Sequence, residues 1–85
     1  MTVSVFQRLS RAEQLHIAFQ AGTFLARRWQ PAGSVNLYYL PVAGTGLLIE
    51  VACTDAPGCP IRWVRARAAH APLTDYADGL VLPTL

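Results

Sequence analysis

The most reactive side chains in this 85-residue sequence are two cysteines, Cys53 and Cys59, at the ends of the segment CTDAPGC. The Pro57-Gly58 pair inside the segment predicts a hairpin turn, and paired hairpin positions bring Cα atoms near the separation that a disulfide requires. A reducing cytoplasm keeps thiols free. We therefore expect two free thiols, one of them packed as a small apolar side chain, with a disulfide as the alternative.

Other chemistry is poorly supported by the spacing of polar residues. A zinc site is not expected, because two cysteines need two more ligands and His16 and His70 have no metal-type spacing. Gly44-Thr45-Gly46 lacks the further glycine and the lysine of a phosphate-binding loop. No histidine lies near Cys59 in the sequence to act as its base. We expect no catalytic residue, metal or cofactor, although the chain holds other polar candidates: Glu50, Asp55, Asp75, Tyr76 and Asp78.

The basic residues are all arginine, and the net charge is +2. Arg27, Arg65 and Arg67 are predicted to alternate with tryptophans along strands, a pattern that proteins use to bind single-stranded nucleic acid. The low net charge and the lack of an RNA-binding signature count against this function. Charged residues also protect edge strands from aggregation, and Glu50 can neutralise one arginine across strands. Nucleic-acid binding is therefore the alternative function.

Composition predicts one small packed domain over residues 1–85, since 53% of the residues are apolar and 14% are charged. An uncharged run over residues 29–49 contains too many prolines, glycines and polar residues for a transmembrane helix. The first residues lack the apolar core of a signal peptide. We expect a cytoplasmic protein with no membrane partner.

The elements that position these side chains follow from local signals. Thr2 or Ser4 is predicted to cap a short first turn, and Ser10 with Glu13 matches a capping box before a helix over residues 11–21. Gly22 is expected to end that helix in a left-handed conformation. Two-residue periodicity predicts strands over 23–29, 34–40, 46–54 and 61–68, joined as an antiparallel meander, and a short helix over 72–78. The predicted fold class is α+β, with the helices on one face of the sheet.

Alternation divides the strand residues between two faces. The face that the helices should cover is expected to hold Phe24, Ala26, Val35, Leu37, Tyr39, Leu47, Ile49, Val51, Val64 and Ala66. The other face is expected to show Leu25, Arg27, Trp29, Asn36, Tyr38, Leu40, Leu48, Glu50, Trp63, Arg65 and Arg67. An uncovered face with so many large apolar side chains indicates an interaction surface.

The segments GTFLARRW, VNLYYL, LLIEV and IRWVRA, followed by PLTDYADGL, resemble a group of short uncharacterised proteins from Bacteroidetes bacteria. The likeness covers residues 10–82 and consists of hairpin and core residues. The resemblance implies the same capped helix and meander, and no activity, cofactor or catalytic residue. The loop that holds Cys53 and Cys59 departs from the pattern, so the resemblance implies nothing about the thiols.

The function predicted from the sequence is protein interaction or self-association without catalysis. Tryptophan, tyrosine and arginine are enriched where interface energy concentrates. We expect a homo-oligomer formed through the second face or an edge strand, and a further protein partner is left unidentified. The expected interaction face consists of Trp29, Tyr38, Leu40, Leu48 and Trp63.

Overall fold

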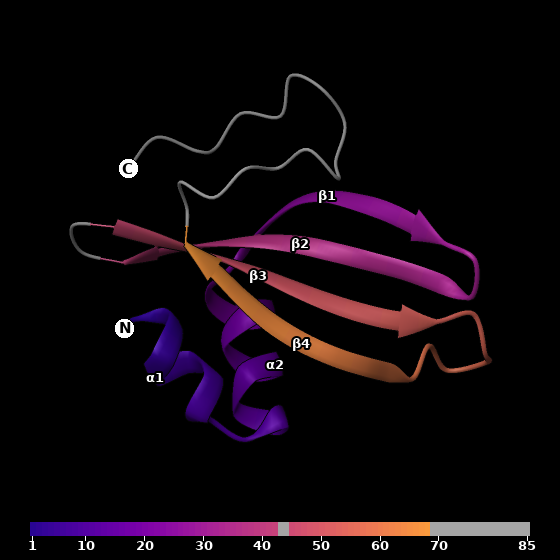
Figure 1. Cartoon of the computed structure of the whole chain (residues 1–85), viewed down its shortest axis with the longest axis horizontal. Helices are drawn as coiled ribbons and strands as arrows, with labels where there is room; N and C mark the ends of the chain where they lie inside the picture. The colour runs from indigo at the N-terminus through magenta and orange to yellow at the C-terminus, as the bar shows by residue number, and fades with distance from the viewer. Residues whose placement is uncertain (43–44, 69–85) are drawn as a thin grey trace.

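The computed structural model describes residues 1–42 and 45–68 (Figure 1). Two helices precede one antiparallel sheet of four strands in the order β1-β2-β3-β4. This arrangement confirms the predicted α+β meander, and each strand boundary agrees with its prediction to within two residues. The predicted helix over 72–78 lies outside the described residues. The elements are α1 (Val3–Arg8), α2 (Arg11–Ala21), β1 (Thr23–Gln30), β2 (Gly33–Val42), β3 (Thr45–Thr54) and β4 (Ile61–Ala68).

Both helices begin at the predicted caps. The Thr2 hydroxyl accepts a hydrogen bond from the Val5 N–H at 3.1 Å, which satisfies a free amide at the start of α1. Ser10 and Glu13 form the reciprocal capping box of α2, with both bonds at 3.1 Å. The left-handed conformation predicted for Gly22 is wrong. Its φ is −82° and its ψ is 152°, because the chain extends directly into β1.

The helices cover one face of the sheet (Figure 1). Phe6 of α1 and Ala18 of α2 are fully buried against this face. Two glutamines reinforce the packing: Gln14 Nε2 donates to the Phe6 carbonyl at 3.0 Å, and Gln7 Oε1 accepts from the Ala66 N–H of β4 at 3.1 Å. We call this side of the sheet the helix face. Its core is built from Phe6, Ala18, Leu40, Leu47, Ile49, Val51 and Ala66.

The predicted face of β2 is wrong. Tyr38 pairs with Ile49 and Leu40 pairs with Leu47, so these β2 side chains lie on the helix face. Val35, Leu37 and Tyr39 therefore lie on the opposite face. The sequence prediction placed a five-residue turn over 41–45, whereas strand pairing continues as far as Val42 and Thr45. The longer ladder changes the pairing offset by one residue, which moves every β2 side chain to the other face.

The opposite face is buried as well, and we call it the Glu50 face. Leu37, Tyr39 and Leu48 form a second core, with Leu25 and Ala26 packed against it. The expectation that this face is an exposed apolar surface is therefore wrong. A β-bulge in β1 between Phe24 and Ala26 interrupts the alternation. Phe24 consequently pairs with Tyr38 on the helix face, while Ala26 pairs with Leu37 on the Glu50 face.

Candidate functional site

The five residues of the expected interaction face do not form one surface. Strand register places Trp29, Tyr38 and Leu40 on the helix face, and Leu48 and Trp63 on the Glu50 face. Leu40 and Leu48 are buried core residues. The prediction of a shared face is wrong because the β2 offset moves Tyr38 and Leu40 to the helix face, and the β1 bulge moves Trp29 there.

Exposed aromatic side chains gather instead along β1, which is an edge strand of the sheet. Trp29 is 72% exposed, Phe24 is 50% exposed, and Phe19 at the end of α2 is 52% exposed. The rings of Phe19 and Phe24 both meet the Tyr38 ring edge-on, at centroid distances of 5.6 and 5.8 Å. These contacts join α2, β1 and β2. We call Phe19, Phe24, Trp29 and Tyr38 the β1 edge surface.

Two members of the β1 edge surface were not predicted from the sequence. Phe24 was expected in the core of the sheet, and Phe19 lies in the helix predicted over residues 11–21, which was expected to cover that core. Alternation reports which face a side chain occupies, but it does not report how close the strand lies to the edge of the sheet. The predicted meander already makes β1 an edge strand, and that strand order was the available signal.

The Glu50 face is centred on a buried carboxylate. Glu50 of β3 is 0% exposed, and Arg65 lies directly opposite on β4. Arg65 donates from Nε and Nη2 to Glu50 Oε1 at 3.0 and 2.8 Å. Arg28 Nη2 lies 3.6 Å from Oε2, and Arg67 Nη1 lies 3.7 Å from Oε1. The predicted neutralisation of an arginine by Glu50 is confirmed.

The predicted grouping of Arg27 with Arg65 and Arg67 is wrong. Arg27 lies on the helix face, where its Nε donates to Asn36 Oδ1 at 2.7 Å and its guanidinium is 5.5 Å from the Trp29 ring centroid. On the Glu50 face, the Arg65 guanidinium lies 4.7 Å from the Trp63 ring centroid. Arg65 and Arg67 both contact the Glu50 carboxylate. Arg65 also packs over the Trp63 ring, which would have to stack on bases in a nucleic-acid-binding face.

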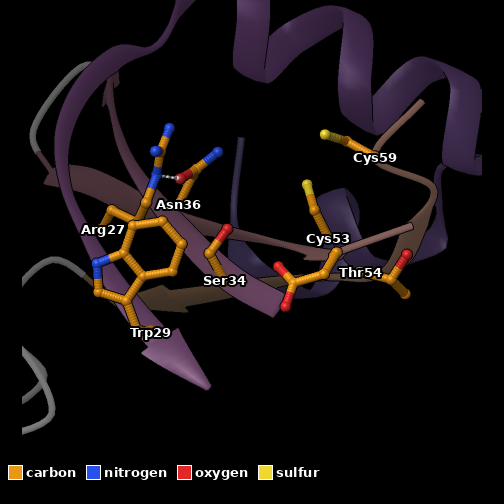
Figure 2. Close-up of a pocket in the computed structure, with 8 residues that line it drawn as sticks. Arg27, Trp29, Ser34, Asn36, Cys53, Thr54 and Cys59 are labelled. Carbon is orange, nitrogen blue, oxygen red and sulfur yellow. Dashed lines mark hydrogen bonds between the residues drawn. The ribbon is translucent and has the colours of Figure 1, made fainter. Parts of the chain in front are cut away.

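A pocket of about 320 Å³ opens at the end of the sheet that carries the β1–β2 and β3–β4 connections (Figure 2). Cys53 enters the pocket from β3, and Cys59 enters it from the loop before β4. Both cysteines are free thiols, with Cys53 half-buried and Cys59 exposed. Their predicted placement at the two ends of this hairpin is confirmed. The pocket is lined by Arg27, Trp29, Ser34, Asn36, Cys53, Thr54, Asp55 and Cys59.

The two thiols occupy different environments. Burial raises the pKa of the Cys53 thiol, the nearby Cys59 raises it further, and the positive charge of Arg27 acts in the opposite sense. Cys59 has a φ of 47°, in the left-handed region, and follows Gly58 at a φ of 84°. Two backbone hydrogen bonds of 3.0 Å hold the loop, from Cys59 N–H to the Ala56 carbonyl and from Thr54 N–H to the Pro60 carbonyl.

Two further findings concern residues 1–42 and 45–68. No group of three or more histidine, cysteine or acidic side chains in these ranges is arranged to hold a metal ion. No helix of the described chain is long and apolar enough to cross a membrane. The remaining polar candidates, His70, Asp75, Tyr76 and Asp78, lie outside the described residues.

Comparisons with protein-family models, curated proteins and solved structures found no match for this chain. The resemblance to short Bacteroidetes proteins therefore stays a prediction. The candidate functional features are the β1 edge surface, the ion cluster of Glu50 with Arg28, Arg65 and Arg67 (the Glu50 cluster), and the pocket that holds Cys53 and Cys59 (the dithiol pocket).

Proposed function

We propose that this protein is a self-association module that binds a second copy of itself through the β1 edge surface and carries out no catalysis. The observation that carries the proposal is the exposure of three aromatic side chains beside one sheet edge: Phe19, Phe24 and Trp29 are each at least half exposed. Large aromatic side chains contribute strongly to interfaces when they are removed from water.

A second copy fits this edge because the surface is suited to pairing with itself. The outward edge of β1 offers backbone N–H and C=O groups to another strand, and two identical edges can pair antiparallel about a two-fold axis. The aromatic rings beside each edge then bury apolar area along the new strand pair. Strand addition of this kind combines backbone hydrogen bonds with side-chain contacts.

Charge disfavours head-to-tail assembly between the two edges of the sheet. The opposite edge, β4, carries the exposed Arg62 and Arg65. Pairing β4 of one copy with β1 of another would bring these arginines toward Arg27, with like charges adjacent. A closed pair through β1 avoids this repulsion, which supports a dimer over an extended chain of copies.

Nucleic-acid binding remains the second candidate, and the arginine geometry does not favour it. Arg65 donates two hydrogen bonds to Glu50, so phosphate contacts would compete with a buried carboxylate. We place the module in the cytoplasm, where a reducing environment keeps the two cysteine thiols free.

Light scattering over a range of micromolar concentrations tests the proposal. We expect twice the monomer mass for the natural chain and the monomer mass for Trp29→Glu, because a charge buried in an apolar interface without a partner is costly. Arg62→Glu is the matched control on the other edge and should leave the dimer intact. Circular dichroism checks that each variant folds.

Two outcomes would overturn this proposal. One is a natural chain that stays monomeric throughout the concentration range. The other is a dimer that survives Trp29→Glu and Phe24→Glu but is lost in Trp63→Glu, which would place the contact on the Glu50 face. Tight binding of a single-stranded oligonucleotide at physiological salt, abolished by Arg65→Gln, would establish the nucleic-acid alternative.

A further inference from the structure

We propose that Cys53 and Cys59 form a thiol–disulfide exchange site that reacts with low-molecular-weight disulfides. Cys59 makes the first bond with the external disulfide, and Cys53 then converts the mixed disulfide into an intramolecular one. This chemistry goes beyond self-association and does not depend on it.

The first support is the placement of the two sulfur atoms. Both thiols enter the same pocket from adjacent chain segments (Figure 2). Cys53 pairs with Ile61 in the β3–β4 ladder, and Cys59 lies two residues before that partner. The hydrogen bond from Thr54 N–H to the Pro60 carbonyl holds the two segments side by side. An intramolecular reaction between these thiols therefore has a high effective concentration.

The second support is the difference in access, which sets the order of the two steps. Cys59 is exposed and can meet a dissolved disulfide, whereas Cys53 is half-buried. Thiolate is the nucleophile in exchange, and burial raises the pKa of the Cys53 thiol, which lowers its thiolate fraction near neutral pH. Cys59 therefore reacts first, and Cys53 is the resolving thiol.

The proposed reaction balances in two exchange steps. The Cys59 thiolate attacks one sulfur of a disulfide RSSR, which forms a Cys59–S–S–R bond and releases RS⁻, protonated by solvent to RSH. The Cys53 thiolate then attacks Cys59 Sγ, which forms the Cys53–Cys59 bond and releases the second RSH. The two cysteines lose two electrons and two protons, and the external disulfide is reduced to two thiols.

The loop between the cysteines has the conformational strain needed for this change. Cys59 lies in the loop between β3 and β4 rather than in the ladder, so the separation of the two thiols depends on the conformation of that loop. Cys59 is held at a φ of 47°, a left-handed conformation that is strained for a residue with a side chain. Moving Cys59 out of the left-handed region would release that strain.

The pocket also has room for the intermediate. Its volume of about 320 Å³ is that of a small ligand site. Arg27 and Trp29 line the pocket together with the two thiols. A carboxylate-bearing adduct on Cys59 would therefore share the pocket with the Arg27 guanidinium. Glutathione disulfide is an appropriate probe because it carries such carboxylates and leaves a mixed disulfide that mass spectrometry detects.

Intact-mass spectrometry of the reduced protein treated with glutathione disulfide tests the proposal. The natural chain should lose two hydrogen atoms without retaining glutathione, and dithiothreitol should reverse the change. Cys53→Ser should accumulate a stable mixed disulfide on Cys59. Cys59→Ser should react several-fold more slowly than Cys53→Ser, because its remaining thiol, Cys53, is half-buried and has a raised pKa that lowers its thiolate fraction.

Alanine variants at the same two positions repeat the test if a serine variant fails to fold. The rate should be independent of protein concentration and unchanged in Phe24→Glu, a variant at the β1 edge surface outside the pocket lining, which separates this result from the outcome of the dimer experiment. Three results would overturn the proposal: a natural chain that ends as the glutathione adduct, a disulfide between two chains, or a Cys59→Ser variant that reacts as fast as Cys53→Ser.

Discussion

Glu50 shows how one buried charge organises a sheet face. A carboxylate at 0% exposure is unfavourable unless it is paired and hydrogen-bonded. Arg65 supplies two hydrogen bonds, and Arg28 and Arg67 add positive charge from the two sides. Arg28 belongs to β1, so its ion pair with β3 spans the intervening strand β2. The cluster thus ties three strands together on the face opposite the helices.

Removing the Glu50 charge should destabilise the fold strongly. Glu50→Gln keeps the side-chain size but removes the negative charge that faces Arg65, Arg28 and Arg67, of which the last two are only 19% and 21% exposed. We expect a loss of about 3 kcal/mol in the free energy of unfolding, measured by urea denaturation. Asp55→Asn, at an exposed acidic position, should change it by less than about 0.5 kcal/mol. Equal stability of the two variants would show that the ion cluster contributes little.

The capping box predicts a pH dependence for α2. The hydrogen bond from the Ser10 N–H lowers the pKa of Glu13 below its ordinary value of 4.5. A lowered pKa in the folded state means that the contribution of Glu13 is present above pH 4.5 and is lost as the pH falls through the folded-state pKa. Glu13→Gln should therefore differ from the natural chain at neutral pH and converge with it in acid, as measured by urea denaturation. A stability difference that persists in acid would contradict this origin.

The elements could be predicted well because their signals are local. Ser10 and Glu13 mark the start of α2, and Pro57-Gly58 marks the β3–β4 turn. The faces of β2 could not be predicted, because Val35, Leu37 and Tyr39 on one side compete with Tyr38 and Leu40 on the other. When both alternations are apolar, only the pairing register decides.

The candidate site was predictable only in part for the same reasons. The two cysteines lie at the ends of the β3–β4 hairpin, as the sequence indicated, whereas Trp29 was predicted on the wrong face of the sheet. Phe24 was assigned to the core because alternation gave its face but not its exposure at the sheet edge, and Trp29 was assigned to the wrong face because the bulge between Phe24 and Ala26 has no clear signal in the sequence. Leu48 and Glu50 lie two residues apart on the same face of β3, and both are buried. Their burial was not predicted, because the alternation was interpreted with only the helix face buried.

Two glycines near the dithiol pocket should respond differently to alanine. A Cβ at Gly33 would overlap the Cys53 carbonyl oxygen, which belongs to the backbone of the paired strand. Gly58 has open space around it but a φ of 84°. We expect Gly33→Ala to cost about 2–3 kcal/mol through overpacking and Gly58→Ala about 1 kcal/mol through conformational strain, measured by urea denaturation. A larger loss at Gly58 would contradict the described register of β2 with β3.

At the scale of the whole molecule, the two edges of the sheet differ in character. β1 is flanked by the exposed rings of Phe19, Phe24 and Trp29, whereas β4 carries arginines. Both faces between these edges are buried. Association is therefore directed to the β1 edge. An interface built on that edge would include Trp29, which also lines the dithiol pocket.

A dimer that stabilises its own subunits should unfold at a temperature that depends on protein concentration. Mass action adds about 1.4 kcal/mol per mole of dimer for each tenfold rise in concentration, which corresponds to an increase of a few degrees in the unfolding midpoint of so small a domain. We expect this increase in calorimetric scans of the natural chain and of Arg62→Gln. Trp29→Glu should have a midpoint that does not change with concentration, because a monomer has no association term. A natural chain whose midpoint stays constant over a hundredfold range, about 2.7 kcal/mol of expected change, would contradict dimerisation through any surface.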